Sequence, residues 1–293
     1  MTTTAARTET AVFVALQAVL ALACTAVAVA EGVDVRHIED ATPLGQAVTY
    51  GTALTPLIAA LVARLSLPSG RGLRLLAGRG WRGWGFRRTS PRTLLLAWAF
   101  GLVPVLAAYL GVWTTGAGRF DGSLSDGLLA ATVLTLPYVL LALAEDIGWR
   151  GLLVARLAEF ARPRTVYLVS GVAWSLSHLW LILFLGGAPE GVPPLYAVAT
   201  FTVATTALGT ILAAMQLRWG IWPGVVAHAT VNAVMYHFAE PSTASANNWI
   251  ATETGLAYAL AMVLAAAVYL RWFAGAAVHQ RHTSDRVDAS IAS

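Results

Sequence analysis

Long stretches of apolar residues follow one another along most of the chain. A helix needs about 20 mostly apolar residues to cross the hydrocarbon core of a bilayer. We expect such helices at residues 11–30, 45–66, 93–115, 127–147, 165–187, 195–217, 220–240 and 254–273. The pattern therefore predicts an all-α, polytopic membrane helix bundle with about eight transmembrane helices, in a single membrane domain over residues 1–293.

The first apolar stretch has two interpretations. Residues Ala28, Val29 and Ala30 resemble a signal-peptidase cleavage site. However, the apolar run is longer than the roughly 7–15 residues of a signal-peptide core. We favour a retained membrane anchor, and the cleaved alternative stays open.

The placement of arginine predicts the orientation of the helices, because cytoplasmic loops carry an excess of Lys and Arg. Residues 64–92 contain many arginines and no acid, so we expect the loop 67–92 to be cytoplasmic. Threading the other helices outward from this loop places both termini in the cytoplasm, including the short polar tail 274–293. Acidic residues then collect in the outer loops.

Composition supports a membrane protein and excludes other classes. The chain is 57% hydrophobic and 12% charged, whereas soluble domains have roughly 25% charged residues. The net charge of +4 is spread between apolar runs, so no nucleic-acid partner is expected. The single cysteine, Cys24, excludes a disulfide framework. The absence of lysine and the abundance of alanine favour a bacterial origin, and hence the bacterial inner membrane.

Aromatic and basic residues alternate over residues 80–88. Indole rings favour the headgroup level of a bilayer, and arginines pair with anionic phosphates. We interpret this segment as an interfacial anchor that binds membrane lipid.

Ionisable residues inside membrane helices are costly and by default indicate a functional site. The fourth expected helix ends with Glu145 and Asp146, and Arg150 follows. Asp146 precedes Arg150 by four residues, the favourable order for an ion pair within one helix. Glu145 points about 100° away from Asp146 and has no partner within its own helix.

Two further expected helices carry polar residues at i, i+4 spacing. The fifth carries Trp174 and His178, and the seventh carries His228 and Asn232. Each residue alone could be a satisfied packing residue or could join helices through hydrogen bonds. Together with Glu145 they predict one shared cavity, because three separate structural explanations are less economical than one site.

A carboxylate beside two imidazoles and an amide suits hydrolysis. The carboxylate can accept a proton from water as a general base, and histidine and asparagine can stabilise an oxyanion. The sequence contains no His-Glu-x-x-His motif and no Gly-x-Ser-x-Gly motif, which argues against zincin-type and serine-hydrolase sites.

The ordered motifs Glu145-Asp146-x-x-x-Arg150, Trp174-x-x-x-His178 and His228-x-x-x-Asn232 resemble the CPBP (CAAX protease and bacteriocin-processing, Abi) family. These intramembrane endopeptidases are related to type II CAAX prenyl proteases. The resemblance covers about residues 130–240, which it identifies as a peptidase core. Asp146 replaces the second glutamate of the family motif, and Trp174 replaces its phenylalanine.

The resemblance implies roles for individual residues. Glu145 would be the base that activates water, and Arg150 would hold the acidic motif or the substrate. The residues that would polarise the scissile carbonyl are His178, His228 and Asn232. The implied substrate is a peptide or protein, such as a leader peptide, a bacteriocin or a membrane-anchored regulator.

Whether the site uses Zn²⁺ stays open. Glu145, His178 and His228 would supply the ligand count of a catalytic zinc centre. However, the histidines lie on different helices, and the sequence offers no evident acceptor for the second nitrogen of either ring. We therefore favour a metal-free mechanism with neutral histidines. Two other functions also stay open: a proton-coupled transporter, and a non-catalytic immunity or scaffold protein.

Overall fold

The computed structural model describes residues 3–66 and 83–274 of the chain. These residues are mostly helical with almost no strand, which confirms the predicted all-α membrane bundle. Most of the arginine-rich loop 67–92 and nearly all of the tail 274–293 lie outside the described residues.

The elements follow one another in this order: α1 Thr3–Ala30, η1 Val35–Asp40, α2 Pro43–Gly51, η2 Thr52–Leu54, α3 Thr55–Leu65, α5 Pro91–Thr115, β1 Arg119–Phe120, α6 Leu124–Ala131, α7 Thr135–Asp146, η4 Ile147–Val154, α8 Ala155–Leu157, α9 Pro163–Leu176, α10 Leu179–Phe184, α11 Pro194–Trp219, α12 Ile221–Val234, η5 Met235–Ala239, β2 Thr243–Ala244, α13 Leu256–Tyr269 and η6 Leu270–Ala274. Strands β1 and β2 form one short antiparallel pair.

Six helical stretches of the described residues are long and apolar enough to cross a membrane, and a bent pair makes a seventh. The prediction of about eight is roughly consistent with this number. The remaining expected helix, 220–240, forms α12 and η5. Its polar residues His228, Asn232 and His237 lower its hydropathy, so it is not among the apolar helices.

The fourth expected helix, 127–147, is not continuous. It is divided into α6 and α7, which meet at 41°. Pro137 explains the break, because a proline ring clashes with the carbonyl four residues earlier and lacks an N–H. The hydroxyl of Thr135 donates to the carbonyl of Ala130 at 3.0 Å, which satisfies one of the backbone groups that the break exposes.

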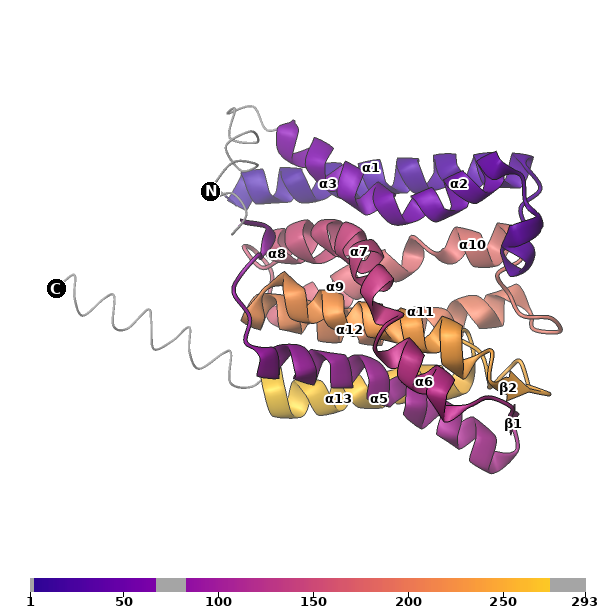
Figure 1. Cartoon of the computed structure of the whole chain (residues 1–293). Helices are drawn as coiled ribbons and strands as arrows, with labels where there is room; N and C mark the ends of the chain where they lie inside the picture. Colours follow the sequence, from indigo (N-terminus) through magenta and orange to yellow (C-terminus); the bar gives the residue numbers. More distant parts are fainter. Residues whose placement is uncertain (1–2, 67–82, 275–293) are drawn as a thin grey trace.

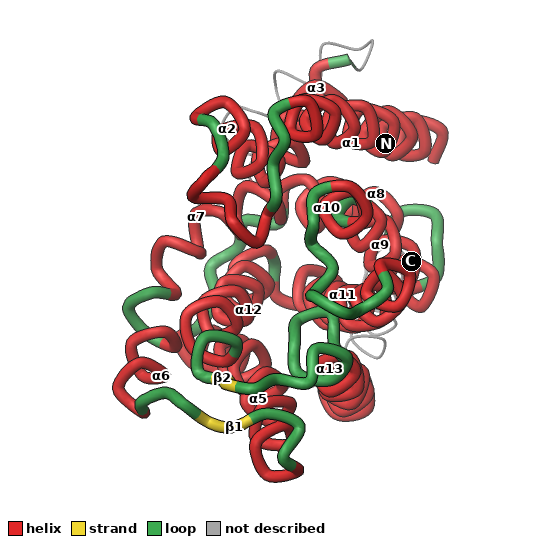
Figure 2. The backbone as a smooth tube through the Cα atoms, turned by 90° about the vertical axis from the view of Figure 1, so that its right-hand side faces the viewer, coloured by secondary structure: helices red, strands yellow, loops and turns green. Residues whose placement is uncertain are grey.

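The helices run roughly along a common direction, and α12 lies within the bundle (Figure 1). In the view of Figure 2, α1 and α3 form a layer on one side and α5 and α13 a layer on the other. Between them, α12 contacts α5, α7 and α11. The start of α1 and the end of η6 lie at the same end of the bundle, as expected if both termini share one side of the membrane. Which side that is stays a prediction.

Glycines permit the close approaches that bring the motif-bearing helices together. Gly209 on α11 is so close to Gly171 on α9 that an added Cβ would lie 2.9 Å from the Gly171 Cα. On α5, a Cβ at Gly101 would lie 2.5 Å from the carbonyl oxygen of Ala227 on α12. Small residues commonly allow membrane helices to pack backbone to backbone in this way.

Candidate active site

The buried indole of Trp174 on α9 contacts four of the residues that the sequence singled out. Its Nε1 donates a hydrogen bond to Glu145 Oε2 at 3.1 Å. The guanidinium carbon of Arg150 lies 3.9 Å from the centroid of the indole ring. The rings of His178 and His228 make edge contacts with it at centroid distances of 5.8 Å and 5.0 Å. The indole therefore joins residues of α7, η4, α9 and α12, together with His178 where α9 ends.

Asp146 and Arg150 form the ion pair that their spacing predicts. Arg150 Nη1 donates to Asp146 Oδ1 at 2.8 Å, and both side chains are buried. Asp146 has a second neighbour that the sequence did not reveal. His228 Nδ1 on α12 lies 3.5 Å from the same oxygen, Asp146 Oδ1. Asp146 therefore connects the acidic motif to α12 as well as to Arg150.

Burial separates the two acidic residues of the motif. Asp146 is completely buried, whereas Glu145 keeps part of its surface accessible. Among the described residues, Asp146 Oδ2 and Arg150 Nη2 have no hydrogen-bond partner. Buried polar groups without partners are costly, so these two atoms mark a polar position in the interior of the bundle.

The acidic motif stands where the helix changes its winding. Ile147–Val154 form a π-helix, η4, directly after α7, and such turns occur frequently at functional sites. Helix α3 packs directly against η4 at Gly148. A Cβ added there would lie 2.5 Å from the carbonyl oxygen of Pro56, so only glycine permits this close approach. The helical structure therefore continues beyond residue 147, with a winding that the sequence did not indicate.

His178 lies at the break between α9 and α10, partly accessible. Its Nδ1 lies 2.9 Å from the carbonyl oxygen of Trp174. A carbonyl oxygen only accepts, so Nδ1 is the donor, and Nε2 of the neutral ring carries a lone pair. Neutral His178 can therefore accept a proton or a hydrogen bond through Nε2, and it can donate to an oxyanion there only as imidazolium. In this tautomer a neutral His178 does not donate through Nε2, and its expected role in polarising the carbonyl stays a prediction.

Asn232 lies one turn after His228 on α12 and is partly accessible. Its side chain has no hydrogen-bond partner among the described residues. Its amide is therefore available to a substrate, but no contact joins it to Glu145 or His178.

The donor set does not form a ready-made metal centre. In the described part of the chain, the only group of three such residues with ligand atoms within 4.8 Å of one another is the exposed set His37, Glu39 and Asp40. Glu145, His178 and His228 are not gathered in this way. The sequence nevertheless missed an acceptor for His178, because the Trp174 carbonyl oxygen lies 2.9 Å from its Nδ1. His228 Nδ1 lies 3.5 Å from Asp146 Oδ1 and makes no hydrogen bond among the described residues.

Residues 127–234 match the family model described as type II CAAX prenyl endopeptidase Rce1-like. This segment, residues 127–234, is similar to that family and is called the Rce1-like core below. This finding confirms the family resemblance drawn from the motifs, and the matched segment contains every predicted site residue. The family description names an endopeptidase, so the match supports a protease in general. No curated protein matches the chain. The helices α1, α2, α3, α5 and α13 lie outside the Rce1-like core.

Proposed function

We propose that the chain is an intramembrane endopeptidase in which Glu145 activates a water molecule for attack on a peptide bond. The observation that carries this proposal is the hydrogen bond from Trp174 Nε1 to a partly accessible Glu145, within the Rce1-like core. The bond orients one carboxylate oxygen and leaves the other for water. Because His178 and His228 contact the same indole, the base lies close to two further groups that can exchange protons.

In the proposed reaction, Glu145 removes a proton from water as the water oxygen bonds to the scissile carbonyl carbon. The carbonyl oxygen becomes an oxyanion, which hydrogen bonds from the Asn232 amide and from the His228 ring stabilise. The proton on Glu145 then passes to the leaving nitrogen as the C–N bond breaks. Such positioned proton transfer typically contributes about 10²–10⁴-fold to the rate.

Asp146 has a supporting role in this proposal. It is completely buried and faces both Arg150 and His228, so it cannot reach an incoming substrate as Glu145 can. Its carboxylate pairs with Arg150, whose guanidinium lies against the Trp174 ring, and it faces the ring of His228. Each step above uses only residues of this chain, and none is assigned to zinc.

The proposed substrate is a membrane-associated peptide or protein that reaches the site from the cytoplasmic side of a bacterial inner membrane. Leader peptides, bacteriocins and membrane-anchored regulators are the classes that we favour. The family description also names prenylated CAAX substrates, so a prenylated peptide belongs in the test.

The decisive experiment compares membrane fractions that contain either the wild-type protein or Glu145→Gln, by mass spectrometry of new peptide termini. A quenched fluorescent peptide, with and without a C-terminal prenyl group, is assayed in parallel with the purified proteins in lipid vesicles. Glu190→Gln, in an exposed loop, serves as the matched control. Fragments that require Glu145 but not Glu190 support the proposal, whereas identical fragments from all three proteins would favour a non-catalytic function.

A further inference from the structure

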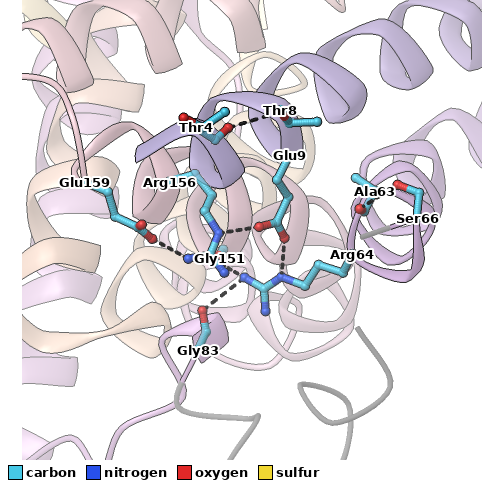
Figure 3. Close-up of polar contacts among 10 residues, drawn as sticks. All are labelled: Thr4, Thr8, Glu9, Ala63, Arg64, Ser66, Gly83, Gly151, Arg156 and Glu159. Carbon is cyan, nitrogen blue, oxygen red and sulfur yellow. Dashed lines mark hydrogen bonds and ion pairs between the residues drawn. The ribbon is translucent and has the colours of Figure 1, made fainter. Parts of the chain in front are cut away.

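A buried ion cluster lies outside the candidate active site and joins three parts of the chain (Figure 3). Glu9 on α1 receives a hydrogen bond from Arg64 Nε on α3 at 2.9 Å and from Arg156 Nε on α8 at 2.6 Å. The side chains of Glu9 and Arg64 are fully buried. Arg156 also pairs with Glu159. Glu9 therefore accepts hydrogen bonds from two arginines that come from distant parts of the sequence.

Arg64 also binds the backbone next to the acidic motif. Its Nη2 donates to the carbonyl oxygen of Gly151 at 3.4 Å and to that of Gly83 at 3.1 Å. Gly151 belongs to the π-helix η4 and directly follows Arg150 of the motif. The guanidinium carbon of Arg64 lies over the Trp84 ring, 3.5 Å from the ring centroid. Its position is therefore set by a charge, a ring and two carbonyl groups.

The backbone that Arg64 holds at Gly83 continues to the start of α12. The carbonyl of Gly85 accepts a hydrogen bond from the N–H of Ile221, the first residue of α12, at 2.9 Å. Gly85 has a φ of +85°, and a Cβ there would lie 2.1 Å from Gln216 Nε2. The segment 83–85 therefore fits closely against the junction between α11 and α12. Ile221, which it contacts there, precedes His228 by seven residues on α12.

We propose that Arg64, balanced by Glu9, is a positioning residue for the candidate active site. It holds η4 through Gly151 and α12 through the 83–85 segment, so that Glu145 and His228 stay against Trp174. Both Glu9 and Arg64 lie outside the Rce1-like core, so α1 and α3 contribute to its working geometry. The catalytic part of this inference rests on the proposed peptidase function, and its structural part does not.

A double variant separates positioning from simple stabilisation. Replacing a buried ion pair with apolar residues of similar size is often neutral or stabilising, and Arg156 keeps Glu159 as a partner. In Glu9→Met with Arg64→Met, we expect near wild-type thermal stability and a kcat lowered roughly 10- to 100-fold by misplaced groups, with KM little changed. Amide hydrogen exchange in residues 147–154 should be faster, and exchange in α11 should not change.

Three single variants complete the experiment. Arg64→Lys offers a point charge instead of a planar fork, so we expect partial recovery of kcat and of protection in residues 147–154. Gln17→Leu is the matched control, because it breaks the Gln17–Thr55 hydrogen bond between α1 and the start of α3 without touching Gly151. Glu9→Gln replaces the double variant if that protein does not fold, and it should show the same lowered kcat and faster exchange.

Wild-type kcat and wild-type exchange of residues 147–154 in the double variant would overturn the inference, and would leave the cluster as stabilisation only. Failure of the peptidase function has a different signature. If wild type cleaves no peptide, the exchange of residues 147–154 still decides whether Arg64 positions η4. Unchanged exchange there in every folded variant overturns the inference whatever the activity.

Discussion

Trp174 Nε1 donates to Glu145 Oε2 across 3.1 Å, and this bond joins α9 to the last turn of α7. Trp174→Phe keeps an aromatic ring but removes the donor. A hydrogen bond to a charged group contributes about 1.5–3 kcal/mol, so we expect kcat to fall roughly 10- to 100-fold without complete loss. Single-turnover cleavage measures this effect. Full activity in Trp174→Phe would show that the indole N–H does not orient the base.

The two acidic residues of the motif should behave differently. We expect Glu145→Gln to lower the rate by about 10²–10⁴-fold, the usual effect of losing a general base. Asp146→Asn should lower it only partially, because Asp146 is buried between Arg150 and His228. Steady-state cleavage by both variants, compared with their thermal stability, makes this test. Equal and total loss in two folded variants would mean that the acids act as a unit.

Chelation separates the two mechanisms that the sequence left open. We expect cleavage to persist after exhaustive chelation, because Glu145, His178 and His228 do not converge as a ligand group among the described residues. Elemental analysis of the same sample should find no bound zinc. Activity that is lost and then restored by stoichiometric zinc would make Glu145 a ligand and Asp146 the base instead.

Glu253 should make stability depend on pH. Burial, and then the neighbouring Glu240, raise the pKa of Glu253 from 4.5 to about 7. The folded state therefore binds this proton more tightly than the unfolded state does. The stability that Glu253 contributes is fully present below about pH 4.5 and is lost as the pH rises through about 7. Thermal unfolding from pH 5 to 8 should show this fall in wild type, and Glu253→Gln should reduce it. An unchanged slope in that variant would assign it to other groups.

The orientation of the bundle can be tested directly. We expect reporter fusions at residues 80 and 293 to report the cytoplasm, because arginine collects on that side. A fusion within the outer loop 240–253, which carries Glu240 and Glu253, should report the opposite side. An external signal at residue 80 or 293 would invert the bundle, and would place the end that contains Glu9 and Arg64 outside.

The sequence alone determined the helical class and the pairs that lie within one helix. Lipid offers no hydrogen bonds to the backbone, so long apolar runs must form helices, and the runs are visible in the sequence. The Asp146–Arg150 pair was equally predictable, because residues four apart share a helix face. The order of the motifs was sufficient to predict the family, which the match to residues 127–234 confirms.

Only the tertiary structure decided which groups meet across helices. Nothing local indicates that Trp174 donates to Glu145, that Asp146 faces His228, or that Glu9 balances Arg64. These contacts depend on how each helix is rotated and how closely it approaches its neighbour. The π-helical winding after Asp146 shifts that rotation locally. The hydropathy pattern shows where a helix lies, but rotation and approach are set by side-chain packing between residues far apart in the sequence.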